Sequence, residues 1–505
     1  MGKKLAELLP FLPKHGKIKY VSEIFVLGGG ADLSEKTVVM PPEEIARQKG
    51  FLLECAELLK PRFGEGHTLL ALVHSYGCQQ NTSDGEKLMG MLAEMGFGFT
   101  ETPADADLIL YNTCAVRENA EVKVFGNVGE LSHLKKARPE MLIGLCGCMM
   151  QQSHIAEKIK KSYPQVDFVF GTHSLPKFPE ILRDTLKSQK RVFQVEESDG
   201  VLAEGIPVHR TPGVKASLPI MYGCNNFCTY CVVPLVRGRE RSRQPEDVLK
   251  EAREIADAGF KEITLLGQNV NSYGNDLEGG LRFPELLRKV NGVPGDFWIR
   301  FLSSHPKDCT KELIDTIADC EKVCNHIYLP VQSGSNRVLK LMNRNYTVEW
   351  YKELISYARE RIPGVMFTTD LIVGFPGETE EDFMQTLSLV NEVKFASLFT
   401  FIYSKREGTR AAKMEDPVPK EEKSRWFAML LDAQRKIGAD YYKGYVGKTF
   451  RVLCDGKSPL GLAGRTEFNA VIDFPGEESL IGRFLQVEVT SADKHNLTGE
   501  IRTVE

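Results

Sequence analysis

The chain has 505 residues, of which 42% are hydrophobic and 26% charged, and its formal net charge is −4. A chain of this length is too long to form one ordinary hydrophobic core, so we expect two to four domains. The small negative net charge does not indicate nucleic-acid binding. No run of about 18 uncharged apolar residues occurs, and Glu7 and Pro10 interrupt the N-terminal apolar stretch, so neither a membrane span nor a signal peptide is expected.

The N-terminal part of the chain alternates strand and helix patterns. Residues 1–66 are expected to be an extension with one amphipathic helix, PEEIARQKGFLLECAELL, and residues 67–190 a domain. In that domain the apolar stretches TLLALVHSYG, ADLILYNT, MLIGLCG and VDFVFG alternate with helical patterns, the first of which should begin at Ser83 and end at Gly96. Continuous apolar strands alternating with helices predict an open parallel α/β sheet covered on both faces.

Three cysteines follow the first three strands of this predicted sheet, at Cys78, Cys114 and Cys148. The chain is expected to be cytoplasmic, where grouped cysteines, here among a total of 12, are more often metal ligands than disulfides. Open sheets of this kind bind ligands beyond the C-terminal ends of their strands, so the three thiols should converge on one rim. Cys146 lies deeper in its strand and is interpreted as packing. The alternative is that all of them are buried small side chains.

The central part of the chain shows strand patterns separated by helical patterns. Residues 191–215 are polar and punctuated by Gly and Pro, so we interpret them as a connector that can hold one strand. From residue 216 to 442 the strands read SLPIMYG, EITLLG, FWIRFLSS, HIYLPVQS, MFTTDLIVG and SLFTFIYS, and a trailing helix follows them. One helix between them begins at Pro245 and ends at Gly259, with apolar residues on one face. These units predict a partial (β/α)6 barrel with its functional groups on the loops after the strands.

The first of these strands runs into MYGCNNFCTYC, which places Cys224, Cys228 and Cys231 in a C-x3-C-x2-C pattern. A structural zinc site needs a fourth ligand, and no Cys or His follows within about twenty residues. In a four-iron cluster, three thiolates hold three irons and leave the fourth open to a small molecule. The pattern therefore favours an iron–sulfur cluster, with a structural zinc loop as the alternative.

This spacing, at the end of the first strand of a partial barrel, resembles the radical S-adenosylmethionine (radical SAM) enzymes. The resemblance implies that SAM chelates the open iron and is cleaved to a 5′-deoxyadenosyl radical. TTDLIVGFPGE is similar to the family's G-x-I-x-G-x-x-E, with Glu378 at its end and Asp370 in place of the first glycine. A solvated loop position is the alternative for each polar residue. The implied SAM contacts are Tyr230, Gln268, Asn269, Gln332, Ser333 and Asp370.

The C-terminal residues 443–505 read as short strands joined by close turns, which predicts a small antiparallel β-barrel. GRTEFNAVIDF and GRFLQVEVTSAD resemble the TRAM domain, an RNA-binding module of tRNA-modifying enzymes. The segment holds 8 Lys and Arg against 9 Asp and Glu, so charge alone predicts no basic surface, and a purely structural appendix stays open.

Strand-end cysteines, a radical SAM barrel and a TRAM domain together resemble the methylthiotransferases over residues 67–505. The resemblance implies two 4Fe–4S clusters, the second of them an auxiliary cluster held by Cys78, Cys114 and Cys148. It implies two molecules of SAM, one as methyl donor and one as radical source, for transfer of a methylthio group to an unactivated C–H bond. The implied partners are tRNA through its anticodon stem-loop, an electron donor such as a flavodoxin or ferredoxin, and an iron–sulfur carrier protein. The enzyme is expected to act as a monomer away from membranes.

The stretches SYGCQQNTSD, NTCAVRENAEVKV and LPVQSGSNRVLKLMNR are most similar to the branch that modifies C2 of N6-dimethylallyladenosine at position 37 of tRNA. The branch acting on N6-threonylcarbamoyladenosine is the first alternative, and a non-catalytic RNA-binding metalloprotein is the alternative from another class. Burying a prenyl tail in an apolar pocket would stabilise binding of the prenylated base by about 0.8 kcal/mol for each methylene. A buried carboxylate without a partner is strongly penalised, so one pocket should not serve both bases.

The segment RGRERSR follows the last cysteine of the barrel loop and carries arginines at alternate positions. Alternate spacing along an extended segment aims side chains one way, and guanidinium groups bind phosphates well. We therefore interpret them as contacts to RNA phosphates or to a SAM carboxylate, with a solvated charged loop as the alternative. The arginines are Arg237, Arg239, Arg241 and Arg243.

Overall fold

The computed structural model describes the chain from Val39 to Glu505, with short gaps. The described residues are 39–64, 66–116, 118–196, 198–493 and 496–505. The part of the predicted extension before residue 39, with Glu7 and Pro10, lies outside them. No helix in this described part of the chain is long and apolar enough to cross a membrane.

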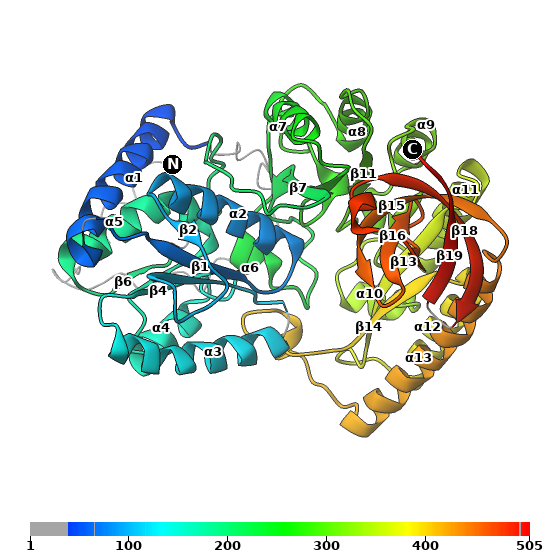
Figure 1. Ribbon diagram of the computed structural model, residues 1–505. Coiled ribbons are helices and arrows are strands. Elements are labelled where there is room, and N and C mark those ends of the chain that lie inside the picture. Colours follow the sequence, from blue (N-terminus) through cyan, green and yellow to red (C-terminus); the bar gives the residue numbers. More distant parts are fainter. Residues whose placement is uncertain (1–38, 65, 117, 197, 494–495) are drawn as a thin grey trace, which may run out of the picture. The chain divides into compact units, whose positions relative to one another are not determined.

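The N-terminal domain is a parallel sheet with helices on both faces, as predicted (Figure 1). Neighbouring strands follow the order β2-β1-β3-β4-β5-β6. Apolar residues of α1, α2 and α5 pack on one face, and those of α3 and α4 pack on the other. The strands are β1 (Leu70–Ser75), β2 (Gly98–Phe99), β3 (Leu108–Thr113), β4 (Leu142–Gly147), β5 (Phe168–Phe170) and β6 (Val192–Gln194). The helices are α1 (Pro42–Phe63), α2 (Gln79–Glu94), α3 (Glu118–Ala137), α4 (Ser153–Ser162), η1 (Thr172–Lys177) and α5 (Phe178–Ser188).

Several boundaries in this domain differ from the prediction. Helix α2 begins at Gln79 rather than Ser83, because Cys78 keeps an extended backbone and takes the N-cap position. The segment predicted as an extension supplies α1, and its Leu52 and Leu59 are buried in the core of the sheet domain. The segment predicted as a connector supplies β6, which pairs with β5. Both segments therefore complete the sheet domain in the structure.

The central domain is built from parallel strands, and the predicted partial barrel is confirmed (Figure 1). β7, β10 and β11 form one sheet and β12, β13 and β14 another, and a parallel bridge from Ile299 to Val323 joins them. Helix α7 begins at Pro245 as predicted and buries Val248 and Ile255. The strands are β7 (Lys215–Pro219), β8 (Met221–Tyr222), β9 (Arg241–Ser242), β10 (Glu262–Leu266), β11 (Trp298–Phe301), β12 (His326–Tyr328), β13 (Met366–Val373) and β14 (Ser397–Ile402). The helices are α6 (Val233–Arg237), α7 (Pro245–Asp257), η2 (Val270–Ser272), α8 (Phe283–Asn291), η3 (Pro306–Asp308), α9 (Lys311–Asp319), α10 (Asn336–Leu341), α11 (Val348–Arg361), α12 (Glu380–Val393), η4 (Ala411–Lys413) and α13 (Lys420–Lys443).

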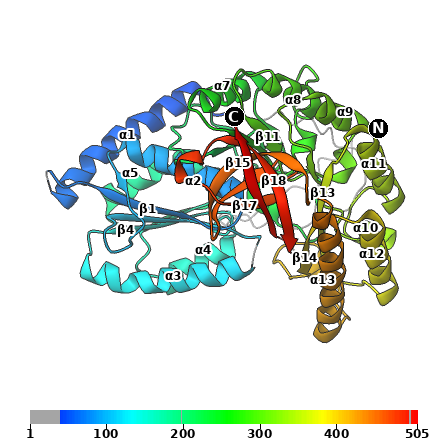
Figure 2. The same cartoon turned by 45° about the vertical axis from the view of Figure 1, so that its right-hand side comes forward.

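The C-terminal strands close into a small barrel in the order β15-β16-β17-β19-β18, orange to red in Figure 2. The pairings are antiparallel except that β17 and β19 run parallel, a detail the prediction lacked. Arg300 of β11 donates to the carbonyl oxygen of Thr466 at 2.8 Å, which ties this barrel to the central domain. The elements are β15 (Thr449–Ser458), β16 (Gly461–Thr466), β17 (Val471–Phe474), η5 (Glu478–Leu480), β18 (Phe484–Asp493) and β19 (Asn496–Val504).

Replacing Leu59 by Ala should destabilise the N-terminal domain by about 2–5 kcal/mol, because the change opens a cavity in a packed core. Leu59 of α1 is fully buried, whereas Leu53 of the same helix is 69% exposed. Denaturant unfolding followed by circular dichroism should show an earlier first transition for Leu59→Ala and an almost unchanged one for Leu53→Ala. Equal curves for the two variants would show that α1 is not part of the domain core.

Candidate functional site

The three cysteines of the barrel loop lie on a segment that is closed at its base by a short ladder. β8 pairs with β9, so residues 223–240 form a loop after the first barrel strand. Gly223 has a φ of +78°, and a Cβ atom there would clash with the carbonyl oxygen of Arg239. Glycine is therefore required where the chain turns into the cysteine loop.

The thiols of this loop are sheltered from solvent. Cys224 and Cys228 are buried and Cys231 is half-buried. Burial raises the pKa of Cys231 to about 12 and also raises the pKa of Cys224. The buried Arg344 donates Nη1 to Cys228 Sγ at 3.6 Å and to Tyr230 Oη at 3.2 Å. The predicted thiols and one guanidinium group thus occupy the C-terminal end of the first barrel strand.

The three N-terminal cysteines lie at the C-terminal ends of neighbouring strands. Cys78 caps α2 after β1, and Cys114 and Cys148 directly follow β3 and β4. A Cβ atom on Gly77 would overlap the side chain of Cys114, so these two strand ends are in contact. Burial raises the pKa of Cys148 to about 12, Arg237 lowers it, and the nearby thiols of Cys78 and Cys114 raise it further. The structure therefore brings the three predicted thiols to one edge of the sheet.

Cys146 lies elsewhere, inside β4 and opposite Asn112 of β3. It is buried in the apolar cluster formed with α1, α2 and α5, and this burial raises the pKa of its thiol well above the usual value. The structure thus places Cys146 in the core and Cys148 at the strand end.

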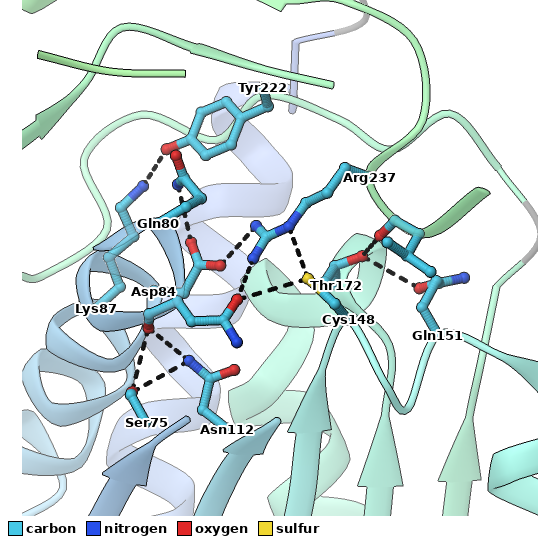
Figure 3. Close-up of polar contacts among 12 residues, drawn as sticks. Ser75, Gln80, Asp84, Lys87, Asn112, Cys148, Gln151, Thr172, Tyr222 and Arg237 are labelled. Carbon is cyan, nitrogen blue, oxygen red and sulfur yellow. Dashed lines mark hydrogen bonds and ion pairs between the residues drawn. The ribbon is translucent and has the colours of Figure 1, made fainter. Parts of the chain in front are cut away.

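A buried polar network joins this edge of the sheet to the barrel loop (Figure 3). Arg237 of α6 donates Nε to Cys148 Sγ at 3.1 Å, and its Nη1 lies 2.6 Å from Asp84 Oδ2 of α2. Its Nη2 donates to Asn81 Oδ1 at 2.6 Å. The Asn81 amide in turn donates to carbonyl oxygens at the ends of β1 and β3, at 2.9 and 2.8 Å. The guanidinium group of Arg237 therefore contacts Cys148, a predicted cluster ligand. It also contacts α2, the helix that begins directly after Cys78, a second predicted ligand.

The side chains at the two sites fit clusters and SAM. Among the described residues no three His, Cys, Asp or Glu side chains surround one metal-ion position, and a four-iron cluster does not require this because its thiolates bind separate irons. Buried polar atoms that lack a hydrogen-bond partner within the described chain gather near the C-terminal ends of the barrel strands, where the amine, carboxylate and ribose groups of SAM would satisfy them. These atoms are Asn269 Oδ1, Ser304 Oγ, His305 Nε2, Asp370 Oδ1 and Tyr403 Oη.

Two of the predicted SAM residues, the buried Asn269 and the half-buried Asp370, each hold a buried oxygen that could accept from a ligand. Asn269 donates to Asp308 at 2.7 Å, and Asp370 accepts from Tyr328 at 2.6 Å through its other oxygen. Burial raises the pKa of Asp370 to about 6, against the lowering effects of the Tyr328 hydrogen bond and of Arg344. An ammonium group bound at Asp370 would favour its ionised form.

The other predicted SAM residues are engaged with the protein. Gln268 Oε1 accepts from the backbone N–H of Gly223 at 2.5 Å, so it supports the start of the cysteine loop. Ser333 Oγ lies 3.3 Å from the hydroxyl of Thr386 on α12. Gln332 is buried with a φ of +70°. Tyr230, as described above, accepts from Arg344. Their contacts to SAM stay predictions.

Sequence reasoning missed three residues of this region. Ser304 and His305 follow β11, and burial together with Arg344 lowers the pKa of His305 to about 2, so its ring is neutral. Arg344 follows α10 and reaches the cysteine loop from far along the chain. The polar run SSHP after the third strand was a usable signal for the first two. No local pattern marked Arg344.

The arginines of RGRERSR need a correction. Arg237 contacts Cys148, Asn81 and Asp84, as described above. Arg241 donates to the carbonyl oxygens of Asp199 and Arg237, and Arg243 pairs with Glu204 and Glu251. These three arginines are buried and bound to protein groups, because a short helix and a hairpin replace the extended segment that was assumed. Arg239 alone of the four is exposed, with its guanidinium 4.9 Å from the centre of the Phe227 ring.

The last barrel strand presents an apolar face beside these residues. Phe399 and Phe401 of β14 are each 50% exposed, and they pair in register with Asp370 and Ile372 of β13. Partners in register share one face of a sheet, so both rings lie on the Asp370 face. The Phe399 ring also contacts the Tyr328 ring, with centroids 6.1 Å apart. A large apolar group bound beside Asp370 would cover these rings.

Comparison with known families agrees with the division of the chain into these regions. The model of the Radical SAM superfamily matches residues 218–390, which contain the barrel and its cysteine loop. The model of the Uncharacterized protein family UPF0004 matches residues 71–171, which contain the strand-end cysteines. The TRAM domain model matches residues 443–501, the closed C-terminal barrel.

Relatives match the chain over nearly its whole length. The tRNA-2-methylthio-N(6)-dimethylallyladenosine synthase of Acetivibrio thermocellus is 50% identical over 470 residues, 92% of this chain and 98% of that protein. The protein of the same name from Clostridioides difficile is 48% identical over 469 residues, again 92% and 98%. Among solved structures, one similar to this chain is the radical S-adenosylmethionine methyltransferase TsrM from Kitasatospora setae, with cobalamin and a 4Fe–4S cluster bound. The match has a TM-score of 0.50 and 14% identity, and it covers 68% of this chain and 77% of that chain. This match shows a shared fold. With such identity along almost the full length of its relatives, the chain belongs to the tRNA-2-methylthio-N(6)-dimethylallyladenosine synthases, which are radical SAM methylthiotransferases.

Proposed function

We propose that the enzyme methylthiolates C2 of N6-dimethylallyladenosine at position 37 of tRNA, using two 4Fe–4S clusters and two molecules of SAM. The names of the relatives support this base, and the TRAM domain supports an RNA substrate. The observation that carries the proposal is that the barrel loop, which holds one set of three cysteines, contacts the strand end of the other set through the buried Arg237. Such an arrangement suits a reaction that needs a radical source and a sulfur source within reach of one substrate carbon.

The residues divide the work of this reaction between the two sites. The thiols of the barrel loop hold the cluster that binds SAM, and the strand-end thiols hold the auxiliary cluster. When bound, these groups supply a carbon-centred radical and a sulfur atom, which acid–base chemistry does not offer at an aromatic C–H bond. Asn269 and Asp370 offer acceptors that orient SAM, and the rings of Phe399 and Phe401 exclude water beside it.

The aromatic face of β14 favours a prenylated base over a threonylcarbamoyl base. Phe399 and Phe401 are half exposed on the same face as Asp370, so an apolar tail placed there gains about 0.8 kcal/mol for each methylene it buries. A threonylcarbamoyl group carries a carboxylate, and aromatic rings do not compensate for its loss of water. Adenine itself can stack on such rings, which is how single-stranded bases are commonly held.

The remaining partners follow from the chemistry of the proposal. Cleavage of SAM at a reduced cluster consumes an electron, so the enzyme takes electrons from a flavodoxin or ferredoxin. An iron–sulfur carrier protein supplies the clusters, and the enzyme acts as a monomer on the anticodon stem-loop. Membership of this enzyme family speaks against the alternative of a non-catalytic RNA-binding metalloprotein.

Replacing Cys224, Cys228 and Cys231 together by Ala should remove about four irons per chain, the content of one cluster, and abolish 5′-deoxyadenosine formation. Iron analysis and chromatography of the SAM products measure both effects. Cys309→Ala is the control, because this cysteine is buried in the barrel core away from the loop. Retained SAM cleavage in the triple variant would reject the assignment of the loop.

Cys148→Ala should damage the auxiliary cluster, while Cys146→Ala should keep most of its iron. Cys148 lies at the strand end beside Arg237, and Cys146 packs inside the core. The visible spectra and iron contents of the two reconstituted variants decide the matter. If Cys146→Ala were the variant that lost its cluster, the ligand assignment at this strand would be wrong.

Three matched tRNA transcripts should separate the candidate substrates. One carries N6-dimethylallyladenosine, one N6-threonylcarbamoyladenosine and one plain adenosine at position 37. With reduced enzyme and SAM, a methylthio group should appear by nucleoside mass spectrometry on the prenylated tRNA only. Faster reaction of the threonylcarbamoyl tRNA would show that the enzyme prefers the substrate of the other branch. A methylthio group on none of the three would contradict the proposed substrate.

A further inference from the structure

Arg237 connects the cysteine loop of the barrel to the strand-end cysteines of the other domain. It ends α6, shortly after Cys231, and its side chain is only 6% exposed. Its guanidinium spreads three contacts over the thiol of Cys148, the amide of Asn81 and the carboxylate of Asp84, at 3.1, 2.6 and 2.6 Å. The sequence pattern predicts a contact of this residue with RNA phosphates or a SAM carboxylate, whereas in the structure its side chain contacts protein groups.

The surroundings of Arg237 fix its direction from both sides. Thr172 of η1 donates to the carbonyl oxygen of Val236, which holds α6 against the N-terminal domain (Figure 3). Lys87 of α2 donates to the hydroxyl of Tyr222, the residue just before the cysteine loop, at 2.5 Å. The guanidinium therefore has little freedom to move away from Cys148, and the fold itself fixes its contact with the sulfur.

A buried guanidinium beside a thiolate has two physical effects. Its planar fork can serve several acceptors at fixed angles, which a lysine ammonium cannot do. Its N–H···S hydrogen bond favours the more negative state of the sulfur and of any cluster bound to it, because hydrogen bonds to sulfur raise the reduction potential of iron–sulfur clusters. Residues that orient metal ligands in this way commonly change metal affinity roughly 10- to 100-fold when replaced.

Resting on the proposed function, in which Cys148 binds the auxiliary cluster, we propose that Arg237 is a positioning residue for that cluster. It holds Cys148 against the barrel loop and raises the reduction potential of the auxiliary cluster. The loop that carries the ligands of the radical cluster thereby also sets the electronic properties of the other cluster.

The test observes the auxiliary cluster alone, in full-length enzyme whose three barrel-loop cysteines are replaced by Ala. Arg237→Lys keeps the positive charge but loses the fork. Because Arg237→Gln would leave Asp84 as a buried unpaired charge, it is combined with Asp84→Asn, which keeps the local net charge unchanged. The midpoint potential and the electron paramagnetic resonance spectrum of the reduced cluster are measured, together with iron retention against a chelator.

The expected result is a lower midpoint potential and an altered resonance spectrum in both Arg237 variants, with iron lost to the chelator roughly 10- to 100-fold more readily. The matched control is Arg243→Lys, which changes an equally buried arginine of the same stretch that pairs with Glu204 and Glu251. The control should leave potential, spectrum and iron unchanged.

The possible results distinguish failure of the Arg237 inference from failure of the proposed two-cluster function. Full iron and an unchanged potential in the Arg237 variants would overturn the inference and leave the auxiliary cluster standing. Equal changes in the Arg243→Lys control would also overturn it, since the effect would then be general loss of structure. Loss of the cluster from Arg237→Lys, with the cluster retained in the Arg243→Lys control, would support the inference. A parent protein without any cluster once the loop cysteines are gone would overturn the two-cluster function itself.

Discussion

The buried ion pair between Arg237 and Asp84 is the constraint on which the arrangement of this enzyme depends. Its two charges come from different domains, at the end of α6 and in α2, and both side chains are buried. Separating them would leave two buried charges without partners, and breaking such pairs commonly costs about 3–5 kcal/mol. The pair therefore resists movement of the strand-end cysteines relative to the barrel loop. The proposed reaction, which draws on two clusters, needs this fixed arrangement, because a small displacement of reacting groups lowers the rate steeply.

The two cysteine sites share one electrostatic design. In each site burial raises the pKa of one thiol to about 12, that of Cys148 in one site and that of Cys231 in the other, whereas Cys78 is exposed. Each also directs one buried guanidinium at one thiol, Arg237 at Cys148 and Arg344 at Cys228. Burial opposes the thiolate form that binds metal, and the guanidinium favours it. The arginines thus offset part of the penalty of keeping cluster ligands away from water.

Much of the fold followed from local pattern, and the long-range contacts did not. The strand positions could be predicted because hydrophobic periodicity marks them in the sequence, and the cysteine spacings are part of the sequence itself. The direction of the Arg237 side chain could not be predicted, because alternate spacing suggested an extended strand. In the structure this residue ends the short helix α6, whose first turn contains Pro234, and its side chain points into the other domain. The start of α2 was misplaced for a related reason: Ser83 looks like a cap, but Cys78 holds that position. The parallel pairing of β17 with β19 depends on barrel closure, which no local signal encodes.

The two barrels of the molecule differ in whether they leave a strand edge open. The C-terminal barrel is closed and leaves no strand edge, so it can offer RNA only an outer surface. The central barrel is partial, and among the described residues β14 pairs with β13 alone. An open edge with exposed aromatic side chains is normally a liability for aggregation. Here Phe399 and Phe401 lie on the same face as Asp370, beside buried acceptors that the described protein does not satisfy. In the proposed reaction, a prenylated base at this edge would cover the exposed rings while SAM satisfied the buried acceptors, so one arrangement of substrate and SAM would account for both features.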